Sequence, residues 1–238
     1  MKEIHFKDLG KNQDYQQTWD FQENLLAETV AVKSKNREKE KSGQTDFEPT
    51  KNHLLFVEHP HVYTLGKSGH IENMLANEEL LNQIEATFVK TNRGGDITYH
   101  GPEQLVGYPI LDLDNFKPDI HLYMRNLEEV IIKTIAHYGL NGERSKGETG
   151  VWLDVGKPYA RKICAMGVKA SRWVTMHGFA LNVNPDLKYF EYIIPCGITD
   201  KAVTSLEREL NQKVQMEDVK EKVKNAFEEV FKCKLITN

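Results

Sequence analysis

Short apolar runs that alternate with longer amphipathic segments are the feature that most constrains the fold of this chain. Runs of about four to eight apolar residues, bounded by glycine, proline or charged residues, are typical of buried strands. Such runs predict strands at residues 54–57, 62–65, 86–89, 106–113, 150–155, 162–168 and 173–183. Because some strands follow one another and others alternate with helices, we expect the α/β (α+β) class, with a mixed β-sheet flanked by helices.

Helical spacing of apolar residues marks further segments at residues 14–32, 119–138 and 217–231. The clearest is 119–138, where Asp119 stands near the start and Gly139 directly follows the end. Its apolar face is expected to carry Tyr123, Leu127, Val130, Ile131, Thr134 and Tyr138. The sequence has no internal repeat and no convincing linker, so we predict a single domain over residues 1–238.

Residues 33–52 interrupt this pattern with a polar stretch that mixes both signs of charge. The stretch has no apolar periodicity, which is typical of a solvated segment. We therefore predict a flexible surface loop here and not a binding patch.

Composition and charge exclude several classes of protein. A net charge of −4 gives no sign of the basic surface that nucleic-acid binding needs. No apolar run approaches the roughly 18 residues that span a bilayer, and residues 1–10 lack a signal-peptide core. We expect a cytoplasmic protein without a nucleic-acid or membrane partner.

The three cysteines are odd in number and lack C-x-x-C spacing, which argues against a disulfide framework and a structural zinc site. Cys164 lies in a predicted apolar strand, and Cys233 is expected in the last turn of the C-terminal helix without polar neighbours. Cys196, between a proline and a glycine, is expected on a surface turn where a thiolate meets a substrate. Cys196 is therefore the best candidate nucleophile, although a buried small residue is the commoner role for any one cysteine.

Other polar groups gather in segments that resemble strands or turns. Residues 93–102 carry paired glycines between Arg93 and His100, but their spacing fits neither the P-loop nor the dinucleotide-binding motif. Taken alone, the paired glycines favour an ordinary hairpin turn. Strand alternation predicts that Lys162, Cys164 and Met166 share one face. His177, beside a glycine, reads in isolation as a hydrogen-bonded polar residue at a strand end.

Taken together, these segments resemble the lipoyl(octanoyl) transferase family. The resemblance is carried by residues 93–108, 162–167, 177–182 and 195–197, in the family's order, and extends from about Leu54 to Leu206. It implies the fold of biotin and lipoate protein ligases, with Cys196 and Lys162 as the catalytic pair. It also implies substrate-binding residues at Arg93, Gly94, Gly95, Asp96, Ile97, Thr98, Tyr99, His100, Ala165, Met166, Gly167, Gly178, Phe179 and Ala180.

The activity implied by the resemblance is transfer of an octanoyl group from acyl carrier protein, through a cysteine thioester, to a lysine of a lipoyl domain. The acceptors would be the lipoyl domains of 2-oxoacid dehydrogenases and the glycine cleavage H protein, and we expect neither a cofactor nor a metal. A lysine ammonium near a thiol favours the thiolate, so Lys162 suits Cys196 chemically.

Two departures and two alternatives stand beside this interpretation. Residues 33–52 are longer than the family's usual connection, which should cost little in a surface loop. Glu103 occupies a position where the family usually has glycine, which leaves the fine shape of that loop open. An ATP-dependent lipoate ligase shares the fold but needs no cysteine, so the Pro-Cys-Gly turn favours the transferase. A non-enzymatic module that binds lipoyl domains would leave Lys162 and Cys196 without a role.

Overall fold

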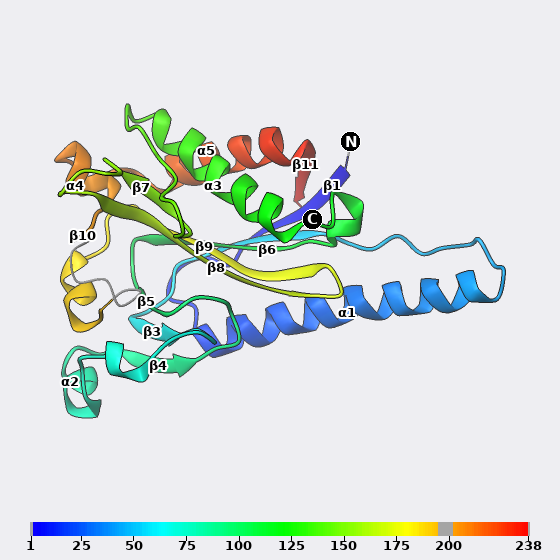
Figure 1. Ribbon diagram of the computed structural model, residues 1–238, viewed down its shortest axis with the longest axis horizontal. Coiled ribbons are helices and arrows are strands. Elements are labelled where there is room, and N and C mark those ends of the chain that lie inside the picture. Colours follow the sequence, from blue (N-terminus) through cyan, green and yellow to red (C-terminus); the bar gives the residue numbers. More distant parts are fainter. Residues whose placement is uncertain (1, 195–201, 238) are drawn as a thin grey trace.

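The computed structural model describes residues 2–194 and 202–237, and its largest element is a mixed β-sheet (Figure 1). The strands follow the order β10-β8-β9-β6-β2-β1-β11, and β7 pairs with β8. β1 runs parallel to β2 and β11, β8 runs parallel to β10, and the other pairs are antiparallel. The strand bounds are β1 Lys2–Asp8, β2 His53–Val57, β6 Gln104–Ile110, β7 Val151–Leu153, β8 Arg161–Ser171, β9 Val174–Asn182, β10 Ala202–Val203 and β11 Cys233–Thr237.

A second sheet is smaller and has the order β4-β3-β5. Its strands are β3 Val62–Leu65, β4 Thr87–Lys90 and β5 Ile97–His100, with β3 parallel to β4 and antiparallel to β5. Tyr63 and Tyr99, both fully buried, form part of its own apolar cluster. This sheet lies on the same side of the main sheet as helix α1 (Figure 1).

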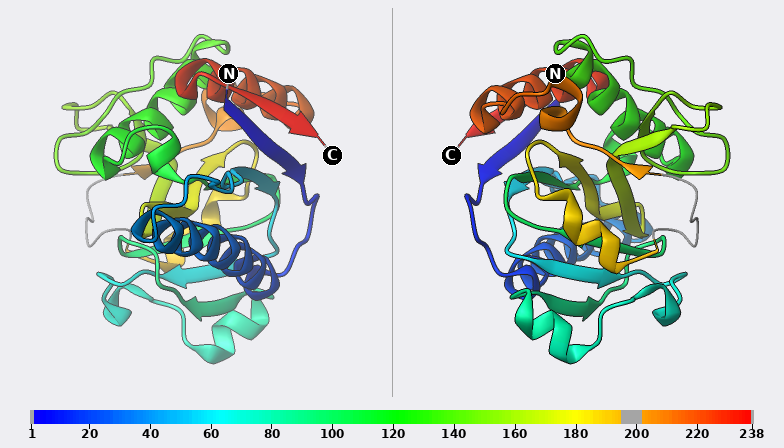
Figure 2. Two further views of the ribbon diagram at one scale, coloured as in Figure 1. Left: turned by 90° about the vertical axis from the view of Figure 1, so that its right-hand side faces the viewer. Right: turned by 90° about the vertical axis from the view of Figure 1, so that its left-hand side faces the viewer.

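Helices cover both faces of the main sheet, as Figures 1 and 2 show. Helices α3 (Ile120–Ala136) and α5 (Met216–Phe231) pack side by side on one face, where Leu127 and Phe227 enter the largest apolar cluster. Helix α1 (Tyr15–Lys41) lies along the other face, where Leu25 and Leu26 enter a second cluster. The shorter elements are α2 Glu78–Gln83, α4 Leu206–Leu210 and the 3-10 turns Ile71–Asn73, Leu113–Asn115 and Leu187–Tyr192.

The expected fold class is confirmed, because the described chain is a mixed sheet between helices. Helix α3 begins as predicted: the Asp119 carboxylate accepts a hydrogen bond from the Leu122 amide at 3.0 Å. The helix ends at Ala136, two residues before the predicted end at Tyr138, and Gly139 takes a positive φ of 77° in the turn that follows. No helix in residues 2–194 and 202–237 is long and apolar enough to cross a bilayer.

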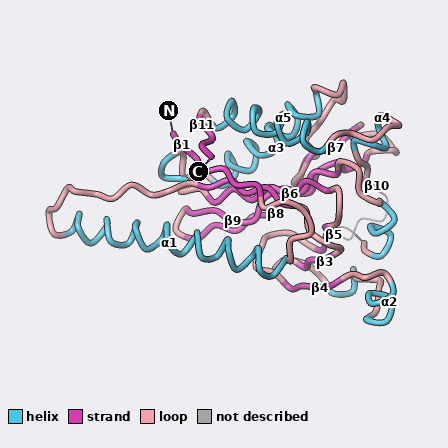
Figure 3. Tube along the Cα trace, turned by 180° about the vertical axis from the view of Figure 1, so that it is seen from behind, coloured by secondary structure: helices cyan, strands magenta, loops and turns pink. Residues whose placement is uncertain are grey.

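The prediction of a flexible loop over residues 33–52 is wrong in its first part, because α1 continues to Lys41 (Figure 3). Lysine, glutamate and arginine are good helix formers, so a helix continues here without an apolar stripe. Tertiary contacts also hold it: Lys33 forms an ion pair with Asp112 and another, at 2.6 Å, with Asp114. Only residues 42–52 connect α1 to β2 without regular structure.

Cys233 is not in the last helical turn, contrary to the prediction. Helix α5 ends at Phe231, and Lys232 adopts a left-handed conformation with φ of 51°. Cys233 then begins β11, which pairs with β1. Strands β1 and β11, at one end of the main sheet, were not predicted, because the strand predictions rested on continuous apolar runs and neither segment contains a long one. The alternation of polar and apolar residues in β1 is itself typical of a half-buried strand.

Candidate active site

A pocket lies where the main sheet meets the glycine-rich segment 93–100. The main sheet forms one wall of this pocket and segment 93–100 forms the other, and residues from both walls line it. Predicted site residues that line it are Lys162, Arg93, Gly95, Asp96, Ile97, Thr98, His100, Ala165, Met166, Gly167, Gly178, Phe179 and Ala180. Gly94 and Tyr99 do not line it: the Gly94 amide donates to the Val168 carbonyl, and Tyr99 packs inside the small sheet. The structure thus gathers most of the predicted residues around one cavity.

The remaining predicted residue, Cys196, falls in residues 195–201, outside the described part of the chain. Both flanks of this segment are described. Ile194 and Ala202 line a wider depression that shares Phe190 and Val203 with the pocket. Val203 is also the register partner of Lys162 in the β8–β10 pair.

The glycine-rich segment is held as a rigid wall by two charged side chains. The Arg93 guanidinium donates hydrogen bonds to the Thr64 carbonyl at 2.6 Å and the Thr64 hydroxyl at 2.9 Å. The Asp96 carboxylate accepts from the Ile97 amide at 2.7 Å and from the Asn73 side chain at 2.6 Å. The segment contains strand β5 and is not the simple hairpin turn that its paired glycines favour in isolation.

Glycine is required where this wall touches β8, at Gly167, and where β9 lies against β6 within the main sheet, at Gly178. A β-carbon on Gly167 would lie 2.7 Å from the Gly94 carbonyl oxygen, and one on Gly178 would lie 2.1 Å from the Gly107 carbonyl oxygen. Both distances are shorter than any real contact and involve backbone atoms, which cannot move aside cheaply. These glycines let backbone pack on backbone at the pocket.

A chain of buried hydrogen bonds connects the two walls. His100 Nδ1 lies 2.8 Å from Gln104 Oε1, and the Gln104 amide donates to Asn182 Oδ1 at 2.8 Å. The Asn182 amide then donates to the Thr204 carbonyl at 2.9 Å, next to β10. Burial lowers the pKa of His100 to about 3, so its imidazole is neutral at physiological pH.

His177 lies in the middle of β9 and not at a strand end, and it joins the pocket to helix α1. Its backbone amide donates to Gln22 Oε1 at 2.9 Å, and its Nε2 lies 2.8 Å from Asn92 Oδ1. Its φ of 57° turns the backbone locally into the left-handed region. Burial lowers the pKa of His177 to about 3, so this ring is also neutral.

Several pocket residues were not among the predicted site residues: Tyr15, Gln104, Val106, Tyr108, Thr149, His177, Asn182, Phe190 and Val203. Alternation along β6 turns Gln104, Val106 and Tyr108 toward the pocket. Gln104 and Asn182 lie within sequence motifs that carry the family resemblance, so the sequence could have identified them as site residues. Tyr15 and Phe190 reach the pocket from α1 and a 3-10 turn, and no local pattern marks them.

Lys162 and Cys164 do not share one environment, contrary to the prediction from strand alternation. Lys162 lines the pocket, whereas Cys164 is fully buried in the apolar cluster beneath α3. The pairing of β7 with β8 is irregular between Val151 and Trp152, opposite these two residues, which breaks the simple alternation. Burial raises the pKa of the Cys164 thiol, and the prediction that it is a structural thiol is consistent with this environment.

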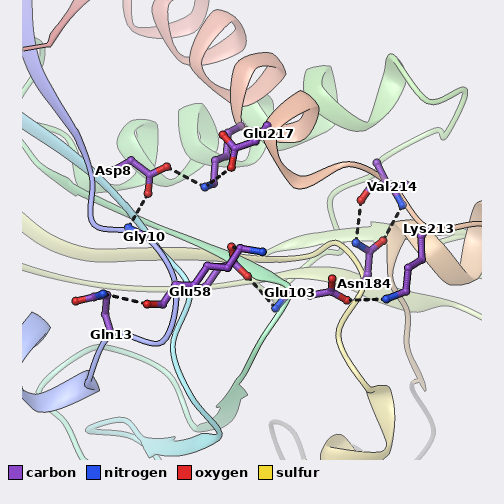
Figure 4. A network of polar contacts seen from close by, with 11 residues as sticks. Asp8, Gly10, Gln13, Glu58, Glu103, Asn184, Lys213, Val214 and Glu217 are labelled. Carbon is purple, nitrogen blue, oxygen red and sulfur yellow. Dashed lines mark hydrogen bonds and ion pairs between the residues drawn. The ribbon is translucent and has the colours of Figure 1, made fainter.

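Glu103 adopts a backbone conformation that glycine takes without strain. Its φ is 60°, in the left-handed region. Its amide donates to Glu58 at 3.0 Å, its carbonyl accepts from the Asn184 amide at 3.0 Å, and its carboxylate lies 3.3 Å from the Lys213 ammonium (Figure 4). The loop shape is therefore kept by backbone contacts that do not depend on the side chain.

Comparison with known proteins shows the family to which the chain belongs. Residues 14–228 match the model of the lipoyl protein ligase A/B catalytic domain. The chain belongs to that family. Within the family, it is 63% identical to an octanoyltransferase of Christiangramia forsetii over 98% of both chains. It is 60% identical to an octanoyltransferase of Flavobacterium psychrophilum over 99% of both chains.

Solved structures support the fold of the family. A bipartite lipoate protein ligase of Thermoplasma acidophilum matches with a TM-score of 0.70 and 16% identity, covering 100% of this chain and 87% of that one. A lipoate-protein ligase A bound with ATP matches with a TM-score of 0.68 and 14% identity, over 100% and 87% of the two chains. At these identities the similarity establishes the shared fold alone.

Proposed function

We propose that this protein is an octanoyltransferase that moves an octanoyl group from acyl carrier protein to a lysine of a lipoyl domain, with Cys196 as the acyl carrier. The observation that carries the proposal is the position of Lys162 in the pocket, directly beside Val203. Val203 lies shortly after the Pro-Cys-Gly segment in the sequence. The high identity to curated octanoyltransferases along the whole chain supports the same activity.

The proposed chemistry proceeds in two balanced steps. The Cys196 thiolate attacks the carbonyl carbon of the octanoyl thioester, a new carbon–sulfur bond forms, and the bond to the carrier thiol breaks. Lys162 in its ammonium form donates the proton that the leaving thiolate takes up. The acceptor lysine amine then attacks the carbonyl carbon of the Cys196 thioester, an amide bond forms, and the bond to the Cys196 sulfur breaks to return the thiolate. Lys162 as an amine receives the proton that the acceptor nitrogen releases.

The apolar part of the pocket suits a medium-length acyl chain. Val106, Met166, Phe179 and Ala180 line it, and all four side chains are buried. Burying each methylene of an acyl chain stabilises the complex by about 0.8 kcal/mol. The close backbone contacts at Gly167 and Gly178 prevent the sheet wall of the pocket from moving outward. The cavity therefore sets a limit on the length of the acyl chain.

The proposed setting is a single catalytic domain in the cytoplasm. The acceptors would be the lipoyl domains of 2-oxoacid dehydrogenases and the glycine cleavage H protein. Of the residues that we propose to bind substrate, Arg93 and Asp96 are engaged in holding the loop wall. Their part is to shape the pocket, while Ala165, Met166 and Phe179 contact the acyl chain.

The experiment that tests this function is incubation of the purified protein with octanoyl acyl carrier protein and a lipoyl domain, without nucleotide. We expect octanoyl transfer to the lipoyl domain at a rate unchanged by ATP and magnesium. The ATP-dependent ligase is the alternative that the shared fold keeps open. A strict requirement for ATP, with free octanoate as the donor, would establish the ligase in its place.

A further inference from the structure

Two polar atoms beside the pocket are buried without a hydrogen-bond partner among the residues that the structure describes: Nδ1 of His177 and Nε2 of Gln22. His177 lines the pocket and is 1% exposed, and Gln22, on α1, is fully buried. The two residues are in contact, because the His177 backbone amide donates to Gln22 Oε1 at 2.9 Å. Buried polar atoms are normally hydrogen-bonded, and one left alone lowers stability. Two such atoms on touching residues point to a group that binds both.

The tautomer of His177 is set by a chain of hydrogen bonds that ends on an ion pair. Lys169 binds Glu23 Oε1 at 2.9 Å, and the same oxygen accepts from Asn92 Nδ2 at 2.7 Å. Asn92 therefore turns its Oδ1 toward His177 Nε2, 2.8 Å away, and this ring nitrogen must carry the proton. Burial lowers the pKa of His177 to about 3, so the ring stays neutral. Its Nδ1 keeps an unshared electron pair and is a hydrogen-bond acceptor.

The orientation of the Gln22 side-chain amide is set by the His177 backbone. The His177 N–H needs an acceptor, so the oxygen of the Gln22 amide faces it and the nitrogen is the atom left over. Gln22 Nε2 is thus a donor, whereas His177 Nδ1 is an acceptor. A donor and an acceptor on two touching residues match one small group that can both accept and donate, which is a water molecule or a hydroxyl. An alkyl group satisfies neither atom.

His177 lies at the end of the pocket away from Lys162. The pocket follows β8, where Lys162 and then residues 165–167 line it, and His177 is the register partner of the next residue, Val168. Val168 follows Lys162 by six positions, which corresponds to about 20 Å along a strand. The lysine side chain and an extended octanoyl chain together cover about 15 Å at standard bond lengths. An octanoyl chain that begins at the lysine ammonium therefore ends just short of His177.

We propose that His177 and Gln22 form a polar stop that selects the length of the acyl chain: Nδ1 and Nε2 together hold one water-sized group beyond the methyl end of an octanoyl chain. The proposal rests on the proposed function. A longer alkyl chain must displace that group and leave both atoms without a partner, which costs more than burial of the extra methylenes contributes. A chain that ends in a hydroxyl takes the place of the group and keeps both hydrogen bonds.

The main test compares two ligands of equal length in the unaltered full-length protein. Amide analogues of acylated pantetheine carry nitrogen in place of the thioester sulfur, so they bind without transferring the acyl group. The nonanoyl and ω-hydroxyoctanoyl chains have the same number of non-hydrogen atoms in line, but only the second ends in a hydroxyl. We expect calorimetry to show about tenfold tighter binding of the ω-hydroxyoctanoyl analogue. A pocket that ends in an apolar wall gives the opposite order, because the buried hydroxyl then lacks a partner.

Two substitutions of His177 separate hydrogen bonding from space. Asparagine places its polar atoms near the position of Nδ1 and tolerates the positive φ of 57°, whereas glutamine places its polar atoms near Nε2. We expect His177→Asn to keep the preference for the hydroxyl-ended chain, and His177→Gln and Gln22→Met to reduce it to about twofold or less. If space alone selected the chain, the smaller asparagine would change the preference more than glutamine does. That order of the two variants would overturn the polar stop.

The control is Tyr123→Phe, which removes a buried hydroxyl beneath α3 on the other face of the sheet and should leave the preference unchanged. If the unaltered protein binds the nonanoyl analogue as tightly as the hydroxyl-ended one, the polar stop is wrong, whether or not octanoyl transfer occurs. A preference that depends on His177, in a protein that transfers no octanoyl group, supports the polar stop and rejects the proposed function. If no acyl analogue binds, the pocket holds no acyl chain and both proposals are rejected.

Discussion

The two faces of the main sheet bury different kinds of side chain, although the same strands form both. The face under α3 and α5 is filled by apolar side chains such as Leu127, Cys164 and Phe227. The face toward α1 and the small sheet buries His100, Gln104 and Asn182 beside its apolar residues, each joined by hydrogen bonds. One face supplies apolar burial, and the other supplies a polar site in which burial favours hydrogen-bonded groups. Among the described residues, Gln22 Nε2 and His177 Nδ1 are buried on this face without a hydrogen-bond partner. The difference is sharpest on β8, where Cys164 belongs to the first face and Lys162 lines the pocket of the second.

The largest effect on the acylation rate should come from removing the charged side chain of Lys162 from the pocket. Lys162→Ala should slow acylation of the enzyme about 10²-fold, since it removes a proton donor and the cation that favours the thiolate. The pH optimum should also move upward, because a thiol without a cationic neighbour ionises at higher pH. Rapid-quench acylation rates across a pH series measure both effects. Arg161→Lys, on the same strand but bound to carboxylates, is the control and should stay within a few-fold of the parent. An unchanged rate in Lys162→Ala would contradict the catalytic pair.

Low pH should reduce the free energy of unfolding through the buried histidines. Burial lowers the pKa of His59 to about 4 and that of His100 and His177 to about 3, against about 6.5 in the unfolded chain. Below pH 6.5 the unfolded chain binds protons that the folded chain does not. The stabilisation is therefore complete above pH 6.5 and is lost as pH falls toward these low values.

At pH 5 each of these histidines should reduce the free energy of unfolding by about 2 kcal/mol relative to pH 7.5. Urea unfolding at a series of pH values measures the slope, and His100→Gln should make that slope shallower by one proton. A slope that is the same in the variant and the parent would show that His100 is already charged in the folded protein.

Shortening the connection after α1 should have a small effect. Replacing residues 42–49 with a short Gly/Ser linker removes the contacts of Asp46 and Glu48 with Lys39 and Asn36, all of them exposed. Exposed contacts of this kind contribute little to stability. We expect acylation within a few-fold of the parent, measured beside a urea unfolding curve. A loss above tenfold would mean that this connection takes part in substrate binding.

The smallest expected effect is on stability, from replacing Glu103, whose backbone φ is positive. Glu103→Gly should raise the free energy of unfolding by about 0.5 to 1 kcal/mol, because glycine takes positive φ without strain. The lost ion pair with Lys213 is exposed and offsets little of this gain. Glu103→Ala removes the carboxylate but keeps the β-carbon, so it separates the two contributions. If the alanine variant equals or exceeds the glycine variant in stability, backbone strain is not the cause.

The sequence predicted the apolar face better than the polar one, for a physical reason. Periodicity reports which side chains are buried together, so it located α3, its Asp119 cap and the buried strands β2 and β3. It did not locate β1, because that strand contains no continuous apolar run, although it pairs with β2 and β11. The extension of α1 to Lys41 is also held by the contact of Lys33 with Asp112, about eighty residues away in sequence. Long-range polar contacts of this kind leave no local pattern.

The candidate site also contains residues that the sequence could predict and residues that it could not. The sequence motifs identify Lys162, Arg93 and the glycines as site residues, but they do not distinguish residues that contact substrate from residues that only hold the wall. Arg93 is bound to Thr64, and Tyr99 lies in the small sheet, because strand β5 turns alternate residues away from the pocket. Tyr15 and Phe190 enter the site only through tertiary packing.

The most direct test of the central claim is to locate the acyl group after treatment with octanoyl acyl carrier protein. Peptide mass spectrometry should find one octanoyl group on Cys196 in the parent protein and in Cys164→Ala. It should find none in Cys196→Ala, although that variant keeps Cys164. An octanoyl group on Cys164, or an adduct that persists in Cys196→Ala, would contradict the account, since the apolar core would then be carrying the chemistry assigned to the pocket.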